Sequence, residues 1–503
     1  MGHRAGNCHQ LPVGKAQFAN GLCYIHVQPH RRRDSPRLRP DFPAFQKKTA
    51  TRFGKFVEAS PVSVMIQGTL ERVLDPAKLQ QVFDDNAVWQ YTKELTFEQC
   101  GQIMSDVVFQ VTPSVGAWYK AHPDELNVTR QAVYDKLKHI ELPVSAALVR
   151  YSYAELLPVA KSMGIRPRPL LTGYNVRALD GNHLSGTEHR ILETRRHRAA
   201  ALPGQALAFY DPQWDFISDV IPCECGHAQE RSLTEEILAA ICRRDCVLAD
   251  RNFCTTRIVF GIDRRKAFFV IRQHKTNVEW KRQGKKRSIG KDEHGRRIDE
   301  QTVVLTDPQS GETLTARRIT IHLDKPTKDG EMEIHILTNL PAKDADALKV
   351  ASLYADRWTI ETAFQHLTVD LRCEINTLGY PKAALFGFCL ALVAYNVVSL
   401  VKAGIRAAHG KDFVEEELSM YYLTLELAQV SSGMQIAIEE KHWEVFRAMS
   451  IDQFAETMVE LAARMDTRKY TKHKRGPKKK QPKKISGKKI KHVSTAKLLA
   501  RRA

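Results

Sequence analysis

The chain has 503 residues, of which 43% are hydrophobic, 26% charged and 8% aromatic, and these proportions exclude a wholly disordered, collagen-like or coiled-coil protein. The formal net charge is +19, and the excess lies at the two ends, because residues 1–50 carry nine bases and two acids and residues 464–503 carry 17 bases and one acid. The long segment between them is close to neutral. Polycationic ends on a nearly neutral body are typical of a protein that binds a polyanion.

Ten cysteines are present without a short repeated framework, and no apolar secretory segment opens the chain. A reducing cytoplasm is therefore the expected compartment. Five cysteines and one histidine gather between residues 223 and 254. Their spacing matches no standard pair of zinc knuckles, so buried thiols are favoured over a structural zinc site.

Residues 1–60 show no sustained apolar period and contain the run Arg31-Arg32-Arg33 with several prolines, which predicts a poorly ordered basic extension. From residue 61 to residue 165 the pattern is helical, and we expect a separate all-α DNA-binding domain there. Thr129, Arg130 and Gln131 open a short helix inside it. Such a helix could read a major groove, since these side chains reach phosphates and base edges. The alternative is an amphipathic helix that packs on its neighbours.

From residue 166 onward strands and helices follow in the order βββαβαβ, which predicts an α/β fold in which a mixed sheet is flanked by helices. The expected strands span residues 176–179, 206–210, 216–221, 246–249 and 267–272, and the expected helices span residues 230–244 and 255–264. Residues 166–273 and 333–410 would form this domain. Residues 274–332, whose apolar residues alternate with period two, would form an inserted β subdomain.

A helical pattern runs from residue 344 through Glu361, and a C-terminal helical region is expected over residues 411–463. The uncharged stretch 385–401 barely reaches membrane-spanning length and contains Asn396, so a buried core helix is favoured over a membrane span. Residues 464–503 cannot bury a core, and we expect a disordered basic tail that contacts DNA nonspecifically. A merely solubilising tail is the alternative.

Three acidic residues stand out by position. Asp180 closes the first predicted strand, Asp250 closes the fourth, and Glu361 lies in the helix after the insertion. The first and fourth strands of such a sheet are expected to be neighbours, so the two aspartates would meet. Three close carboxylates repel one another unless divalent cations neutralise them, and hard oxygen ligands favour two Mg²⁺ or Mn²⁺ ions. Such a pair of ions suits attack on phosphodiesters. The alternative is that the aspartates only cap turns.

The helix around Glu361 adds to this interpretation. Tyr354 and Arg357 fall on the same helical face as Glu361. A cation one turn before a metal-binding carboxylate would pair with a bound phosphate. Tyr354 could donate to a neighbouring phosphate oxygen, and Trp358 could stack on an unpaired base. The alternative is an ordinary helix with an exposed Arg-Glu pair.

These residues resemble the DDE transposases of bacterial insertion sequences, in the subgroup marked by a Tyr-x2-Arg-x3-Glu-x6-Lys signature, insertion sequence family four. Tyr354, Arg357 and Glu361 fit that signature. The resemblance extends over roughly residues 120 to 400 and includes further blocks at residues 179–184, 202–204, 248–253, 337–341 and 394–396.

The resemblance implies a ribonuclease H-like catalytic domain, with the β insertion between the second aspartate and the glutamate, and cut-and-paste DNA transposition. Asp180, Asp250 and Glu361 would be the catalytic residues and would bind the metal ions, while Tyr354, Arg357 and Trp358 would contact DNA. The implied partners are double-stranded DNA, as terminal inverted repeats and target DNA, and a second copy of the chain in a homodimer on DNA. The implied location is the bacterial nucleoid.

One position departs from the signature, because Thr368 stands where a lysine is expected. Threonine cannot supply the charge that contacts phosphate near the cleavage point. Lys382 or a base in the insertion could replace it. The alternatives for the whole protein are a catalytically inactive, transposase-derived DNA-binding protein or regulator, and a general nuclease of the same fold.

Overall fold

The computed structural model describes residues 52–90, 94–184, 203–226, 228–327, 329–365, 378–473 and 476. Its centre is a ten-stranded sheet with the order β3-β2-β1-β4-β5-β10-β9-β8-β6, in which β7 also pairs with β8. The strands are β1 (Asn175–His183), β2 (Gln205–Asp211), β3 (Phe216–Cys223), β4 (Asp245–Ala249), β5 (Phe268–Arg272), β6 (Glu279–Arg282), β7 (Arg287–Lys291), β8 (Arg297–Thr306), β9 (Thr313–His322) and β10 (Glu333–Thr338).

The first five strands form the mixed sheet that the sequence predicts. β1 runs antiparallel to β2 and parallel to β4, and β4 runs parallel to β5. All five residues of β4 are buried, as expected for a central parallel strand that is covered on both faces. The predicted ribonuclease H-like fold class is therefore confirmed.

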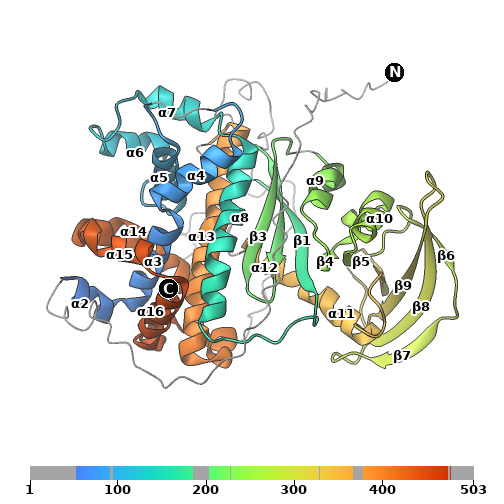
Figure 1. The fold of residues 1–503 in the computed structure, drawn as a ribbon. Coiled ribbons are helices and arrows are strands. Elements are labelled where there is room, and N and C mark those ends of the chain that lie inside the picture. Colours follow the sequence, from blue (N-terminus) through green and yellow to red (C-terminus); the bar gives the residue numbers. More distant parts are fainter. Residues whose placement is uncertain are drawn as a thin grey trace, which may run out of the picture.

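Helices cover both faces of this sheet (Figure 1). They are α2 (Arg52–Ala59), α3 (Pro61–Val73), α4 (Pro76–Asn86), α5 (Phe97–Val108), α6 (Val115–Ala121), α7 (Arg130–Leu137), α8 (Leu142–Ser162), α9 (Thr234–Ala239), α10 (Thr256–Arg264), α11 (Ala347–Asp356), α12 (Trp358–Gln365), α13 (Pro381–His409), α14 (Met420–Ala437), α15 (Glu444–Ala448) and α16 (Ile451–Ala463). One apolar core joins the sheet to α8 and α13, and a second joins the other face to α9 and α10.

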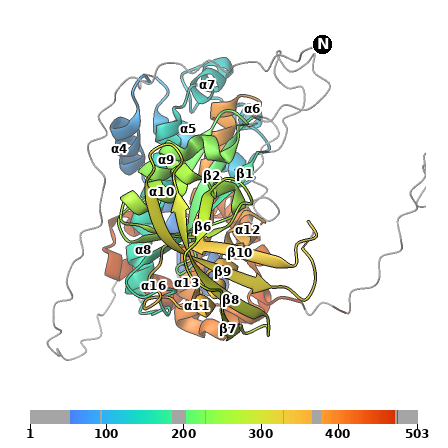
Figure 2. The same cartoon turned by 90° about the vertical axis from the view of Figure 1, so that its right-hand side faces the viewer.

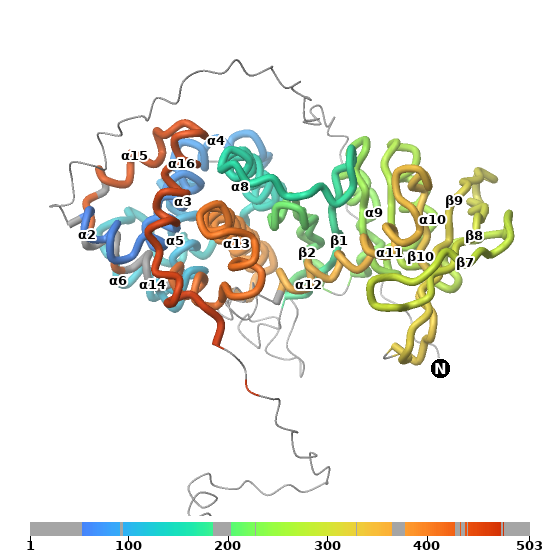
Figure 3. Tube along the Cα trace, turned by 90° about the horizontal axis from the view of Figure 1, so that it is seen from below, coloured from blue at the N-terminus to red at the C-terminus, as the bar shows by residue number. Residues whose placement is uncertain are grey.

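The N-terminal and C-terminal helices belong to one helical body, which corrects the prediction of a separate all-α unit over residues 61–165. α8 packs against α13 and β3, and α3 packs against α13, α14 and α16. Figure 3 shows α3, α13, α14 and α16 side by side. The reason is that α13 is buried along most of its length, so it needs partners from both ends of the chain.

Part of the predicted N-terminal extension is helical. α2 lies inside residues 1–60, and its Phe53 and Val57 are buried. The ring of Phe53 meets Trp443 edge-on, with 5.3 Å between the ring centroids. The prediction of poor order was therefore wrong for residues 52–59, because their aromatic side chains find a distant partner. Residues 1–51 lie outside the described part of the chain.

Part of the predicted disordered tail has regular structure, namely the 3₁₀ helix Thr467–Tyr470. Tyr470 is buried and its hydroxyl donates a hydrogen bond of 3.0 Å to Glu426. Thr471 forms an antiparallel bridge with Leu418. The lysine-rich remainder, apart from residue 476, lies outside the described residues.

The inserted β strands extend the central sheet instead of forming a sheet of their own. β10 pairs with β5 on one side and with β9 on the other, and β8 pairs with β9, β7 and β6. Figure 1 shows these strands at the side of the sheet that lies away from α8 and α13, and in Figure 2 they lie in front of the helical body. β10 is thus the link between the two halves of the sheet.

α13 is long and apolar enough to cross a membrane, yet 94% of its most apolar 18-residue window is buried inside the protein. Its Asn396 accepts a hydrogen bond of 2.8 Å from the Ile217 amide and donates one of 2.9 Å to the Ile217 carbonyl. Asn396 also donates to the hydroxyl of Ser152 in α8. These contacts agree with the expected core helix, because they tie α13 to β3 and α8.

Candidate active site

The parallel pairing of β1, β4 and β5 stops at the same row, next to the candidate site. Their last paired row consists of Leu179, Ala249 and Ile271. The next residues along β1, β4 and β5 are Asp180, Asp250 and Arg272. Side chains in one row of a parallel sheet project from the same face, so the register brings these three charged groups together. The predicted adjacency of Asp180 and Asp250 follows from this pairing.

Asp180 does not close its strand, which corrects the expectation from the sequence. β1 continues to His183 and pairs with β2 over that length, and only the pairing with β4 stops before Asp180. The following Gly181 leaves room for Glu230, since a Cβ atom there would lie 2.1 Å from Oε1 of Glu230 and would displace that side chain. The amide of Gly181 donates a hydrogen bond of 2.9 Å to Oδ1 of Asp180.

Asp250 is held by the turn that follows β4. Its Oδ1 accepts a hydrogen bond of 2.8 Å from the amide of Asn252, so the carboxylate caps the short 3₁₀ helix Arg251–Phe253. The side chain of Asn252 donates a bond of 3.3 Å to Glu230. Asp250 therefore caps this turn and also lies near two other acids, Asp180 and Glu230.

The helical segment that contributes Glu361 is divided at Arg357, which separates α11 from α12. Arg357 still has helical φ and ψ angles, so it lies one turn before Glu361 as the sequence predicts. Its Nη1 donates to Oδ2 of Asp180 at 3.2 Å, and its Nη2 donates to Oε1 of Glu361 at 2.8 Å. One guanidinium thus connects the carboxylates of β1 and α12.

Arg357 is buried, which corrects the alternative of an exposed Arg-Glu pair. Only 6% of its side chain is exposed, against 17% for Asp180 and 41% for Glu361. The guanidinium carbon lies 5.1 Å from the ring centroid of Trp358 and 5.8 Å from that of Tyr354. Tyr354 is buried, whereas Trp358 is 58% exposed. Of the three predicted DNA contacts, Trp358 alone presents a large free surface.

The electrostatics indicate that the three acids share one site. Burial raises the pKa of Asp180 to about 6, and the negative charges of Asp250 and Glu361 add to the rise. The charge of Arg357 and the amide of Gly181 oppose it. Because ionisation of Asp180 is costly at this position, a bound cation would stabilise its charged form.

The residue types fit a hard divalent cation, because three carboxylates supply only oxygen ligands. Their arrangement in this conformation does not gather them around one point: among the described residues, no group of three or more His, Cys, Asp or Glu side chains is placed to hold a metal ion. Arg357 is the group that neutralises Asp180 and Glu361 here. A metal-bound form would therefore require Arg357 to release at least one carboxylate.

Two charged residues at the site escaped the sequence analysis. Arg272 ends β5 and belongs to the same row as the two aspartates, so the strand-end argument could have found it. Glu230 begins the 3₁₀ helix Glu230–Leu233, and its position at the start of the predicted helix over residues 230–244 does not mark it as part of the site. Burial raises the pKa of Glu230, and the nearby charge of Asp250 adds to this effect.

The predicted recognition residues lie far from this site in the sequence, at the start of α7. Thr129 caps the helix by accepting a hydrogen bond of 3.2 Å from the amide of Ala132. Thr129, Arg130 and Gln131 are all exposed, and Val133 is buried against neighbouring helices. The helix therefore packs through one face and presents the three polar residues on another. Their role in reading DNA stays a prediction.

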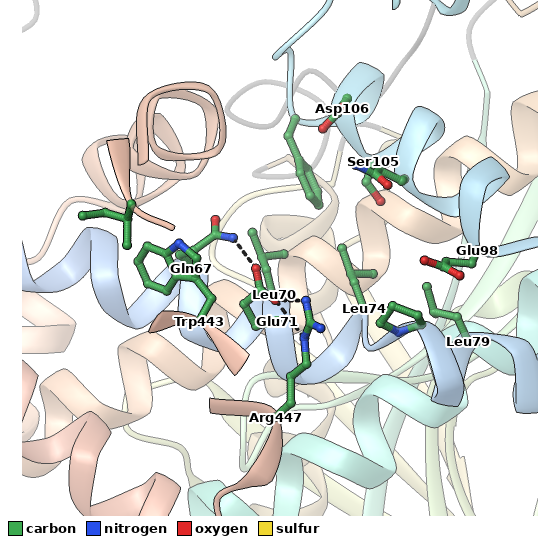
Figure 4. A pocket seen from close by; sticks show the side chains of 14 residues that line it. Gln67, Leu70, Glu71, Leu74, Leu79, Glu98, Ser105, Asp106, Trp443 and Arg447 are labelled. Carbon is green, nitrogen blue, oxygen red and sulfur yellow. Dashed lines mark hydrogen bonds and ion pairs between the residues drawn. The ribbon is translucent and has the colours of Figure 1, made fainter. Parts of the chain in front are cut away.

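A separate cavity of about 360 Å³ lies in the helical body (Figure 4). Its wall includes Gln67, which donates a hydrogen bond of 2.8 Å to Glu71, and Arg447, which pairs with Glu71 at 2.6 Å. Ser105 and Trp443 also line the cavity. Each has a buried side-chain polar atom without a hydrogen-bond partner among the described residues. Such a wall suits ordered water. None of the predicted site residues lines this cavity.

Comparison with known protein families finds a match for the segment that carries these charged residues. Residues 171–397 match the family model described as "Transposase DDE domain". This segment is therefore similar to a DDE domain. It contains Asp180, Asp250 and Glu361 together with the strands and helices that carry them, and it covers slightly less than half of the chain.

No curated protein matches the chain. Among solved structures, the chain is similar to the piggyBac transposase synaptic complex with hairpin DNA, determined by cryo-electron microscopy. The sequence identity is 10%, the TM-score is 0.33, and the alignment covers 79% of this chain and 86% of the other. The similarity of residues 171–397 to a DDE domain rests on the family match and not on this structural similarity.

Proposed function

We propose that the protein is a DNA transposase that moves an insertion sequence by a cut-and-paste reaction, through metal-dependent phosphodiester cleavage and strand transfer. The observation that supports the proposal is that Arg357 connects Asp180 of β1 with Glu361 of α12, with the charge of Asp250 nearby, inside the segment that matches the DDE-domain model. Chemical complementarity supports it, since a buried acidic site with a basic arginine beside it suits a divalent cation together with a phosphate.

In this proposal Asp180, Asp250 and Glu361 hold two Mg²⁺ or Mn²⁺ ions. When bound, such ions lower the pKa of water and stabilise the charge on a leaving oxygen. The contribution of the chain is to fix the carboxylates: the sheet register places Asp180, and the turn after β4 holds Asp250. Arg357 then leaves its carboxylate partners and pairs with the DNA phosphate beside the cut.

The DNA partners in this proposal are the terminal inverted repeats of the element and the target duplex. The exposed residues of α7 would contact the repeats, and the basic tail would bind the phosphate backbone without sequence preference. Two element ends need two active sites, so we infer a homodimer on DNA. A chain that ends at His473 keeps Tyr470 packed and is expected to bind DNA more weakly, with a smaller salt dependence.

The test is nicking of a duplex that carries the DNA bordering the gene. The purified protein should nick this duplex in Mg²⁺ and not in EDTA, and Asp180→Asn, Asp250→Asn and Glu361→Gln should each lower the rate at least roughly a thousandfold. Glu312→Gln is the matched control, because Glu312, in the turn before β9, pairs with Arg264 of α10 in an exposed ion pair. Equal loss in the control would refute the assignment.

The second candidate function is a transposase-derived DNA-binding protein without catalytic activity. Thr368 favours it, because the signature lysine is missing; this position lies outside the described residues. Specific binding of the bordering duplex without nicking in Mg²⁺ or Mn²⁺ would establish this alternative. Nicking of any duplex regardless of sequence would indicate a general nuclease.

A further inference from the structure

Three basic side chains beside the DDE site converge on one acidic side chain. Glu331 pairs with Arg272, with Lys275 at 3.8 Å and with Arg251 at 3.9 Å. Arg251 also pairs with Asp329 at 2.7 Å. Glu331 belongs to the connection between β9 and β10, whereas the three bases come from the ends of β4 and β5.

The bases lie at the edge of the sheet where the acids converge. Arg251 directly follows Asp250, and Arg272 occupies the same row as Asp180 and Asp250. The charge of Arg272 lowers the pKa of Tyr354, although burial raises it overall, so Arg272 also lies near the tyrosine of the signature. The cluster is therefore continuous with the site and is used by none of the roles assigned above.

The cluster carries more positive than negative charge. Three bases face Glu331 and Asp329, and only 19% of the Arg272 side chain and 22% of the Glu331 side chain are exposed. Lys275 is 84% exposed, which leaves an open route to the cluster. An anion with more charge and more acceptor oxygens than a carboxylate, such as a phosphate, would satisfy these donors better.

The backbone of the β9–β10 connection holds Glu331 in place. The amide of Glu331 donates a hydrogen bond of 3.1 Å to the hydroxyl of Thr327, and the carbonyl of Glu331 accepts one of 2.9 Å from the Thr327 amide. Glu331 is thus presented to the three bases by a defined turn. Its side chain can turn away without breaking this backbone pairing.

We propose that Arg251, Arg272 and Lys275 form a subsite for a DNA backbone phosphate next to the cleavage point, and that Glu331 occupies this subsite until DNA displaces it. The inference rests on the proposed function and deepens it. It also supplies the basic contact that Thr368 cannot make. Lys382, the other candidate for that contact, lies 3.9 Å from Glu224.

The experiment measures DNA binding by the full chain in EDTA, where no cleavage is expected. The probes are fluorescein-labelled duplexes with the sequence bordering the gene or a scrambled sequence, titrated at several salt concentrations. Glu331→Gln keeps the shape of the side chain and removes its charge, so it should tighten binding of both duplexes severalfold and steepen the salt dependence. Arg272→Gln and Lys275→Gln should each weaken binding, by up to roughly tenfold, and reduce the salt slope by about 0.9 for each DNA phosphate that the variant no longer binds.

Glu312→Gln is again the control, because it removes the same charge from an Arg-Glu pair outside the site. If Glu331→Gln weakens binding, or tightens it no more than Glu312→Gln does, Glu331 serves only to brace the turn and the proposal is overturned. Lys275→Gln keeps the test decisive if Arg272→Gln fails to fold, since Lys275 is exposed. If the wild type does not prefer the bordering duplex, the proposed function fails instead, which is a different outcome.

Discussion

Replacement of Asp180 by asparagine is expected to make the DNA-free protein more stable while it abolishes nicking. The pKa of Asp180 is raised from 3.8 to about 6 in the folded protein. An acid with a raised pKa binds its proton more tightly when folded, so ionisation of Asp180 costs stability as pH rises from about 4 to about 6 and the cost is constant above that. Asparagine has the shape of the protonated acid and carries no such cost.

The magnitude follows from the shift. About two pKa units correspond to about 3 kcal/mol at pH 8, and the same relation gives about 1 kcal/mol at pH 4.5. The side chain of Asp180 is 17% exposed, so solvent screens only a small part of this cost. The gain from Asp180→Asn should therefore grow by about 2 kcal/mol between these two pH values.

The assay is urea denaturation of wild type and variant in EDTA at both pH values, with Asp85→Asn in an exposed position of α4 as the control. Asp85→Asn should change the apparent free energy of unfolding little at either pH. A variant that is less stable than the wild type at pH 8, or whose gain does not depend on pH, would refute the reasoning. Asp180 would then be a structural partner of Arg357 and not a costly charge kept for function.

Three further substitutions test how the site is supported. Gly181→Ala should lower the nicking rate because the new Cβ displaces Glu230, and adding Glu230→Ala should restore part of that rate. If the two substitutions lower the rate additively in the nicking assay, this explanation is contradicted. Asn396→Leu should lower the free energy of unfolding by about 3 kcal/mol or more, measured by urea denaturation, since buried main-chain groups of β3 lose a partner. Arg177→Met should cost roughly 3 to 5 kcal/mol in the same assay, because it leaves the buried Asp245 without its cation, and an unchanged midpoint would argue against that pair.

The order of strands and the meeting of the two aspartates could be predicted from the sequence because both follow from local patterns. Short apolar runs that alternate with amphipathic helices indicate a sheet with parallel strands. Parallel neighbours end at the same edge, which places Asp180 beside Asp250 without knowledge of any side-chain contact. The spacing of Arg357 and Glu361 is likewise local, and their hydrogen bond follows from one helical turn.

The contacts that the sequence did not predict join segments far apart in the chain. Glu331 meets Arg272 only because β10 returns beside β5, and Phe53 meets Trp443 only because both ends of the chain pack on α13. The sequence around Glu230 looks like any polar connection, and its importance comes from the absent side chain of Gly181. Periodicity reports burial and local geometry, so it cannot say which distant charge will neutralise a given residue.

The two ion-pair clusters of the candidate site are complementary. Arg357 neutralises the acids Asp180 and Glu361, and Glu331 neutralises the bases Arg251 and Arg272. In the proposed reaction DNA offers the phosphates that the bases bind, and cations replace Arg357 among the acids. If only one of these two replacements takes place, the charges of the site do not cancel. Phosphate alone adds negative charge beside the acids, and cations alone add positive charge beside the bases. Binding of DNA and binding of metal should therefore strengthen each other, which would restrain cleavage until both are present.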